Sequence, residues 1–391
     1  MKRLILFTIV FLLVTMSCSD PSSSEEAIIN ATIQWTYPIS TKYMDAVQPL
    51  IIDDIVYVAY DTLLAKFKLQ TGDRLWAMPI ENRRSLATRR LLFDNEVVFL
   101  NHLNNIKAYS SSDGQEIWHS YVADFDAIDL EMLSQNSTSL FLGGIGEILI
   151  IEKSSGAIEQ RIPLDSLVPP GVVQTGRNPI SSQDENYVYI PTGYYQPGDP
   201  ATSGNVFCYE IPSGNFVWGF KIPWKKIKLP GNSDSTQTNS GTYGCAIYDD
   251  LVILPAGHRI LALNRYSGNF EWELFFENDG FDLGLTVFEN MIYVGSIQEM
   301  VYAINARTGK LVWQRKTVGS ITTLITATNE KVYLTNPGGE AIWVLDRSTG
   351  EVLLHNTPPA KYNDSYLSPI GVGNNHIVVL GRKNIFCLSL Q

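Results

Sequence analysis

Short apolar runs separated by turn residues recur along almost the whole chain. Eight of them share one pattern, usually opening after an Asp or Asn turn: Ile55 to Val58, Val97 to Leu100, Ser139 to Leu142, Tyr187 to Ile190, Leu251 to Leu254, Met291 to Val294, Lys331 to Leu334 and Ile377 to Leu380. Short runs rich in β-branched and aromatic residues between turn signals are typical of strands. The pattern therefore predicts an all-β chain built from eight similar units.

A glycine followed four residues later by a tryptophan marks most of these units. Such pairs are Gly72 and Trp76, Gly114 and Trp118, Gly214 and Trp218, Gly268 and Trp272, and Gly309 and Trp313. Gly156 and Gly350 hold the same place in two further units, with Gln160 and Leu354 at the tryptophan position. Successive glycines are 42, 42, 58, 54, 41 and 41 residues apart, which is typical of propeller blades. We predict a single eight-bladed β-propeller of four-stranded antiparallel blades.

An N-terminal strand is predicted to close the ring. The last unit ends at Gln391 without a Gly turn and without a Trp-bearing outermost strand. The segment from Ala31 to Pro38, which contains Trp35, has the pattern of a strand with no hairpin partner of its own. It would complete the final blade, because closure pairs the strand edges that an open array leaves exposed. The propeller is thus predicted to span residues 31–391.

The first residues have the pattern of a secretory signal. Lys2 and Arg3 precede a largely apolar run from Leu4 to Val14, which is too short to cross a bilayer as a helix. The residues before Cys18 resemble the bacterial lipobox, although Thr15 replaces its usual Leu. We expect a signal peptide over residues 1–17, lipidation of Cys18 and a flexible polar tether over residues 18–30. The alternative is an ordinary signal peptide that is cleaved elsewhere.

Composition supports the all-β interpretation and excludes one class of partner. Aromatic residues make up 11% of the 391 residues and charged residues 18%, a balance that favours strands with buried aromatic faces. The formal net charge is -11, and it becomes -13 when Lys2 and Arg3 are removed with the leader. An acidic surface without a basic stripe repels phosphate backbones. We therefore exclude nucleic acid as a partner.

The repeats resemble the PQQ-like, or quinoprotein-type, β-propeller family, and Gly309 to Trp313 is the nearest match to its motif. The resemblance covers residues 31–391. It implies that tryptophans dock between neighbouring blades, and the docking positions are Trp35, Trp76, Trp118, Trp218, Trp272 and Trp313. The family includes quinone-dependent dehydrogenases and non-catalytic proteins, among them the outer-membrane protein assembly factor B lipoproteins. Fold alone therefore does not decide the function.

The dehydrogenases of this family use an adjacent cysteine pair, an Asp base and a calcium ion. No two cysteines are adjacent in this chain. Cys208 and Cys387 hold equivalent places in opposite blades, so we expect them to fill the core and not to bridge, whereas Cys245 lies alone on an inner strand, where it could approach Cys208. These cysteines therefore predict no quinone-binding pair.

Other candidate chemistry is equally sparse. The five histidines form no cluster, and we interpret them as solvated. Asp124, Asp126 and Asp129 are spaced loosely like a cation loop, but they lack its central Gly and closing Glu, so we interpret them as a solvated turn. We predict no catalytic residue, no metal site and no cofactor.

Two insertions break the repeat in its middle. Val58 to Gly72 spans 14 residues, whereas the equivalent span from Ile190 to Gly214 is 24, and a second insertion covers Pro223 to Gly241. In an up-and-down blade both would emerge on one face of the ring. They carry a basic and aromatic set that we predict to be a partner-binding rim: Tyr194, Tyr195, Trp224, Lys225, Lys226 and Lys228. The alternative is that this loop merely packs over the ring and its lysines are solvated.

The sequence thus favours a non-enzymatic lipoprotein of the cell envelope of a Gram-negative-type bacterium. Its lipid would anchor it to a membrane, and we expect this to be the outer membrane. Its monomeric propeller would serve as a scaffold for envelope proteins, in outer-membrane protein assembly or in a surface complex. Two alternatives remain: a PQQ-dependent oxidoreductase, and a carbohydrate-binding surface lipoprotein in which Tyr194 and Tyr195 stack on sugars.

Overall fold

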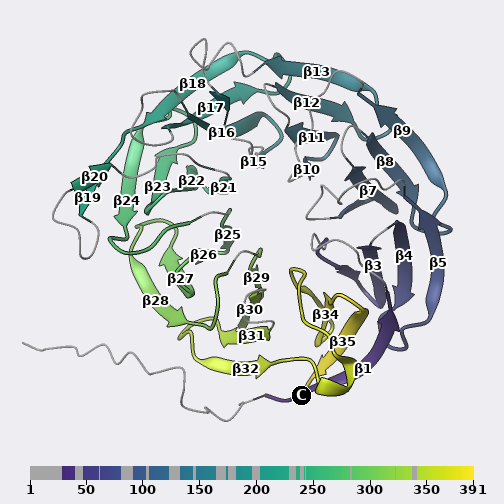
Figure 1. Ribbon diagram of the computed structural model, residues 1–391. Helices are drawn as coiled ribbons and strands as arrows, with labels where there is room; N and C mark the ends of the chain where they lie inside the picture. The colour runs from purple at the N-terminus through teal and green to yellow at the C-terminus, as the bar shows by residue number, and fades with distance from the viewer. Residues whose placement is uncertain are drawn as a thin grey trace, which may run out of the picture.

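The computed structural model describes residues 29–39, 47–60, 62–80, 91–102, 105–122, 133–143, 147–163, 173–174, 182–195, 203–228, 235–237, 242, 244–281, 284–321, 323–336 and 341–391. Eight antiparallel blades stand around a central axis and form a closed ring (Figure 1). The predicted all-β, eight-bladed propeller is confirmed. The described residues contain a single short 3-10 turn, Ala360–Tyr362, and no helix with the length and apolar character needed to cross a bilayer.

The first four blades take their strands in chain order from the inside of the ring outward. Blade 1 contains β2 (Leu50–Ile52), β3 (Ile55–Tyr60), β4 (Leu63–Lys68) and β5 (Arg74–Pro79); blade 2 contains β6 (Leu92–Asp94), β7 (Val97–His102), β8 (Asn105–Ser110) and β9 (Glu116–Tyr121); blade 3 contains β10 (Leu133–Gln135), β11 (Ser139–Gly143), β12 (Glu147–Glu152) and β13 (Ile158–Pro163). Blade 4 has five strands: β14 (Val173–Gln174) and β15 (Ser182–Gln183), which both pair with β16 (Tyr187–Tyr195), then β17 (Ser203–Glu210) and β18 (Phe216–Ile222).

The second half of the ring repeats this order after a small separate hairpin. The hairpin is β19 (Lys226–Lys228) with β20 (Ser235–Gln237). Blade 5 contains β21 (Ala246–Tyr248), β22 (Leu251–Ala256), β23 (Arg259–Asn264) and β24 (Phe270–Phe275); blade 6 contains β25 (Thr286–Phe288), β26 (Met291–Gly295), β27 (Met300–Asn305) and β28 (Leu311–Lys316); blade 7 contains β29 (Thr326–Ala327), β30 (Lys331–Asn336), β31 (Ala341–Asp346) and β32 (Val352–Asn356). Blade 8 contains β33 (Gly371–Gly373), β34 (His376–Leu380), β35 (Asn384–Leu390) and β1 (Ala31–Pro38).

The N-terminal strand closes the ring as its sequence predicted. β1 pairs antiparallel with β35, from Ala31 opposite Leu390 to Pro38 opposite Asn384. One boundary was wrong by two residues, because Ile29 and Asn30, which we assigned to the tether, are already tied to the fold. The Ile29 N–H donates to the Leu353 carbonyl at 3.1 Å, and Asn30 exchanges two backbone hydrogen bonds with Gln391.

Seven of the eight junctions between the described blades are built from a Gly turn and the docking side chain of the blade before it. Trp313 of blade 6 covers Gly350 of blade 7, where a Cβ atom would stand 2.6 Å from the indole. Gly350 also has a φ of 71°, a left-handed conformation that glycine adopts without steric cost. A side chain at this position would therefore collide with the ring and strain the turn.

The indole nitrogen fixes the register of these junctions. In five of them Nε1 donates to the backbone carbonyl three residues before the glycine: Trp35 to Leu69, Trp76 to Ser111, Trp118 to Lys153, Trp218 to Arg265 and Trp313 to Arg347. Blade 3 has Gln160 instead, whose amide, in its satisfied orientation, donates to the Ile211 carbonyl at 3.1 Å. A polar side chain thus reproduces the hydrogen bond without the ring.

The hydrophobic core runs between the blades. One cluster joins Val301 and Ala303 of blade 6 to Leu334 and Leu345 of blade 7, with Trp313 at its outer edge. These strand-two and strand-three residues are buried on both faces of their sheet, because a neighbouring blade covers each face. The near-continuous apolar runs in the sequence follow from this packing.

The two faces of the ring differ in their connections. We call the face with the strand-one-to-strand-two turns and the Gly turns the turn face, and the opposite face the loop face. On the turn face, cations beside four Gly turns pair with acidic residues of the preceding blade: Lys153 with Asp94, Arg265 with Asp184, Arg307 with Asp249 and Asp250, and Arg347 with Glu289. These ion pairs cross the blade junctions beneath the docking residues.

Replacing Trp313 with Ala should lower the free energy of unfolding by about 3 kcal/mol, because a large buried ring and its hydrogen bond are both lost. Trp313→Phe is the matched control. It keeps an aromatic ring over Gly350 and loses the Arg347 hydrogen bond, so it should cost only about 1 kcal/mol. Urea unfolding followed by fluorescence measures both. Equal stability of Trp313→Ala and the unchanged protein would contradict this account of the junction.

Candidate functional site

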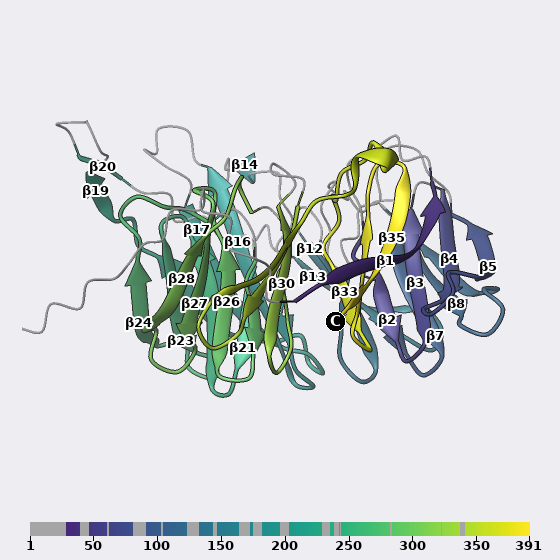
Figure 2. The ribbon, with the colours of Figure 1, turned by 90° about the horizontal axis from the view of Figure 1, so that it is seen from below.

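Both insertions emerge on the loop face. Figure 2 shows β14, which pairs with the far end of β16, and the β19–β20 hairpin along the same upper edge of the ring. Tyr194 and Tyr195 are the last two residues of β16, and their backbones pair with Gln174 and Val173 of β14. The first insertion therefore extends a blade strand beyond the ring and gives it a second partner.

The second insertion projects from the circumference of the ring. Figure 1 shows β19 and β20 outside β24, the outermost strand of blade 5. Lys226 and Lys228 begin and end β19, opposite Gln237 and Ser235 of β20, and the Lys226 side chain is exposed. The basic residues therefore lie further from the ring axis than Tyr194 and Tyr195, which belong to the second strand of blade 4.

A set of contacts fastens the start of this insertion to blade 5. The Lys225 ammonium pairs with the Glu273 carboxylate and lies 4.6 Å from the centre of the Phe275 ring. Arg259, only 1% exposed, donates to the Pro223 carbonyl and has Nη1 3.4 Å from the other Glu273 oxygen. Burial lowers the pKa of this guanidinium, and the Glu273 charge opposes that shift. These contacts of Lys225 and Arg259 thus hold the start of the insertion against blade 5.

Only some of the predicted rim residues are available for contacts. Trp224 is partly buried, and the Lys225 side chain, although 44% exposed, is engaged by Glu273. Arg259 is the residue that the sequence reasoning missed. No other third strand of a described blade begins with Lys or Arg, so the repeat gave no role for this residue. Its partner, the Pro223 carbonyl, is a backbone group that no sequence pattern identifies.

The buried cysteines occupy positions that pack beneath docking tryptophans. Cys208 lies opposite Trp218 in the β17–β18 ladder, and Cys387 lies opposite Trp35 in the β1–β35 ladder. Blade 6 has Ala303 opposite Trp313 at the same place. Most blades have Ala or Cys at this place, although Lys66 holds it opposite Trp76 in blade 1. Both thiols are buried in the core, and neither forms a disulfide.

The third described cysteine and two of the histidines also contact neighbouring residues. Cys245 precedes the inner strand of blade 5 and shares an apolar cluster with Cys208. Its thiol donates to the Tyr189 carbonyl at 3.6 Å and forms no disulfide. His376 contradicts our solvated interpretation: it is 7% exposed, and its ring nitrogens contact Asn374 and Gln34 at 2.6 and 2.5 Å. His355 stacks on Trp343, and burial lowers its pKa. Both histidines therefore have structural partners.

The described residues do not fit a quinone and its calcium ion. No two cysteines are adjacent, and two of the described thiols are enclosed under tryptophans between blades. Within the described part of the chain, no three His, Cys, Asp or Glu side chains are grouped to hold a metal ion. Asp124, Asp126, Asp129 and Cys18 lie outside the described residues.

Burial should make the core thiols inert in the native protein. It raises the pKa of Cys208 and of Cys387 to about 12, so their thiolate fraction at pH 8 is negligible. We expect iodoacetamide at pH 8 to leave both unmodified, and to alkylate both after unfolding in urea. Peptide mass spectrometry separates the two sites. Rapid native labelling of Cys208 would show that this blade junction opens.

Comparisons with known proteins agree with this architecture. The sequence profile of the family described as outer membrane protein assembly factor BamB matches residues 29–220 and 256–390. No curated protein matches the chain significantly. BamB from Moraxella catarrhalis is similar in structure, with a TM-score of 0.64 at 13% sequence identity, over 92% of this chain and 100% of that one.

Two other solved propellers are also similar. The computationally designed Ika8 protein has a TM-score of 0.59 at 15% identity, over 90% of this chain and 98% of its own. Quinohemoprotein alcohol dehydrogenase ADHIIG from Pseudomonas putida HK5 has a TM-score of 0.65 at 10% identity, over 94% of this chain and 77% of its own. Identities this low show a shared fold and nothing further, whereas the sequence profile spans seven of the eight blades and reaches both ends of the ring. The chain belongs to the β-propeller family described as outer membrane protein assembly factor BamB.

Proposed function

We propose that this chain is a non-enzymatic lipoprotein of the bacterial cell envelope, anchored by a lipid on Cys18, whose propeller is a rigid scaffold for other envelope proteins. Outer-membrane protein assembly or a cell-surface complex is the setting that the family membership favours. The partner would bind the loop face, at a rim that contains Tyr194, Tyr195 and the basic segment from Trp224 to Lys228.

One observation carries this proposal. The family profile skips residues 221–255, and this gap contains the whole second insertion with its lysines. A basic hairpin that departs from the repeat, on a chain with a net charge of -11, is suited to recognising an acidic surface on a partner. Its fastening to blade 5 through Lys225 and Arg259 supports this role, because a preorganised loop loses less entropy on binding.

Charge reversal of the two lysines at the ends of β19 tests the rim. We expect Lys226→Glu with Lys228→Glu to reduce recovery of envelope partners in a pull-down about tenfold, with the largest effect at low salt. Lys225 is left intact because it pairs with Glu273 and its loss would release the segment. The matched control is Lys310→Glu with Lys316→Glu, which reverses two exposed lysines of blade 6, away from the rim.

Each outcome of this experiment is decisive. Reduced recovery with the β19 variant and normal recovery with the control supports the rim. Unchanged recovery with the β19 variant contradicts it and leaves the lysines as solvated surface. Partners should be identified beforehand by crosslinking and mass spectrometry on intact envelopes, which also reports whether Cys18 carries lipid.

The alternative function is quinone-dependent oxidation, because a quinohemoprotein alcohol dehydrogenase has a similar fold. Incubation with PQQ and calcium should give neither bound quinone absorbance nor dye-linked alcohol oxidation, since no two cysteines are adjacent in the sequence and the three described ones are buried. The measurement is made on the full chain beside a known quinoprotein dehydrogenase as positive control. Turnover would overturn the scaffold proposal in favour of an enzyme.

A further inference from the structure

On the turn face, half of the eight junctions between the described blades share an ion pair, and one junction lacks the Gly turn itself. At four junctions, a cation next to the Gly turn of one blade reaches an acidic residue in the strand-one-to-strand-two turn of the preceding blade. In the clearest case, Arg347 of blade 7 contacts the Glu289 carboxylate at 2.6 Å and lies 5.4 Å from the centre of the Phe288 ring. The space beside each of these turns is therefore occupied by a neighbour's guanidinium or ammonium group.

Blade 8 cannot supply this group to blade 7. Its outermost strand is β1, which comes from the N-terminus, so no hairpin and no Gly turn connect its third and fourth strands. The docking position of blade 7 is also changed, since Leu354 replaces tryptophan and is buried against the apolar cluster that includes Ile29 and Ile33. The seam between blades 7 and 8 thus lacks both halves of the standard junction.

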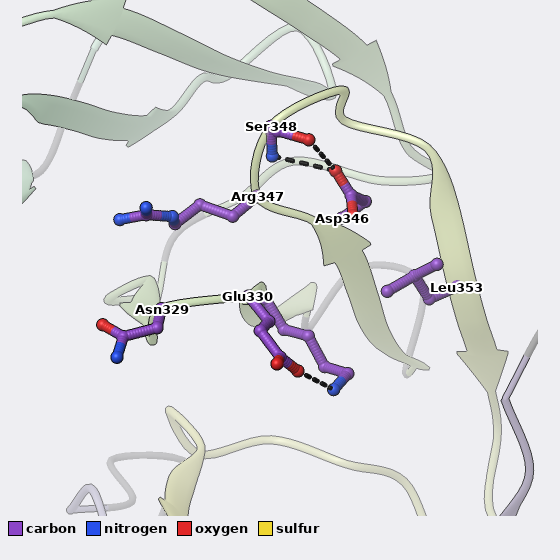
Figure 3. A pocket seen from close by; sticks show the side chains of 7 residues that line it. Asn329, Glu330, Asp346, Arg347, Ser348 and Leu353 are labelled. Atoms are coloured by element: carbon purple, nitrogen blue, oxygen red, sulfur yellow. Dashed lines mark hydrogen bonds and ion pairs between the residues drawn. The ribbon is translucent and has the colours of Figure 1, made fainter.

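A cavity of about 410 Å³ remains at this seam, and all the side chains that line it belong to blade 7 (Figure 3). Figure 3 shows Asn329 and Glu330 on one side of the cavity and Asp346, Arg347 and Ser348 of the Gly turn on the other, and Lys331 also lines it. The outer-strand residue Leu353 adds an apolar surface. This volume is in the range of pockets that hold small ligands, so it can admit an arginine side chain.

Of the two carboxylates that line the cavity, the one of Glu330 is able to accept hydrogen bonds from a ligand. Asp346 is satisfied by its own turn, because its Oδ1 accepts from the Ser348 N–H at 2.9 Å and hydroxyl at 2.6 Å. Arg347 is directed to Glu289 of blade 6. The Glu330 side chain is 80% exposed, and within the described chain its carboxylate forms an ion pair with the adjacent Lys331, at 3.2 Å.

The equivalent turns of other blades indicate which group would fill this space. Glu330 holds the second place of its turn, as Asp250 does in blade 5, and Asp250 accepts from Arg307 on the Gly turn of blade 6. We propose that the seam cavity binds an arginine presented on a tight turn of a partner protein, in the way that Asp250 receives Arg307 within the ring. The partner would supply the Gly turn that blade 8 does not have.

This site is separate from the rim. It lies on the turn face between blades 7 and 8, whereas the rim lies on the loop face of blades 4 and 5. The proposal therefore does not depend on the function proposed above. A variant that abolishes partner binding at β19 would leave the seam cavity unchanged.

A peptide copy of the chain's own turn is the probe. A cyclised hairpin of residues 300–316 contains β27, the Gly turn with Arg307, and β28, whose ends pair as Met300 with Lys316. We expect saturable binding to the full chain by calorimetry, weakened at least fivefold by Arg307→Ala in the peptide or by Glu330→Gln in the protein, and weaker still at high salt. A photocrosslinker at the peptide's Thr308 should label residues near Asn329 and Ser348.

Two controls make the result specific. Glu271→Gln removes an exposed carboxylate from the outermost strand of blade 5 and should leave peptide binding unchanged. The variant with Lys226→Glu and Lys228→Glu should also bind the peptide normally. No saturable binding, equal binding of the Arg307→Ala peptide, or crosslinks on the loop face would each overturn the proposal.

Discussion

The contact of a docking side chain with the Gly turn of the next blade is the interaction on which the rest of this structure depends. It combines a steric condition with a directional one: the turn must be free of a Cβ atom where the ring lies, and its carbonyl must face the indole N–H. Burial of the ring gives the stabilisation, and the hydrogen bond sets the register of the two blades. In the described chain the contact recurs at seven of the eight junctions, from blade 8 through blade 1 to blade 7, and it is missing between blades 7 and 8.

Closing the ring leaves one blade junction incomplete. A ring made from one chain must join its ends somewhere, and here β1 pairs with β35 to complete blade 8. Trp35 on β1 restores the standard contact to blade 1 through the Leu69 carbonyl. On its other side, blade 8 has no Gly turn to offer to blade 7, and the cavity beside Glu330 remains. The same strand that closes the ring thus creates its most irregular junction.

The irregular parts of the chain gather away from the regular core. Blades with apolar second and third strands enclose each other on both faces, which leaves no room for functional groups between them. Variation is confined to the loop face, where the insertions of blades 4 and 5 emerge, and to the seam on the turn face. The described blades thus form a rigid frame whose irregular parts lie at its edges.

The sequence by itself determined the number of blades, their strand order and the closing strand, because each of these rests on a local signal that repeats. The Gly–Trp spacing, the apolar runs and the unpaired strand around Trp35 are readable without knowing what they touch. The sequence also indicated that Cys208 and Cys387 fill the core, since alanine holds the equivalent place in other repeats.

Only the tertiary structure decided the contacts that join residues far apart in the chain. The fastening of Pro223 by Arg259, the burial of His376 against Gln34 and the attachment of Ile29 to Leu353 depend on pairs that no spacing rule connects. The seam cavity is of the same kind. Its lining comes from two turns and the outermost strand of blade 7, and the missing Gly turn of blade 8 can be recognised only when the other junctions are seen in space.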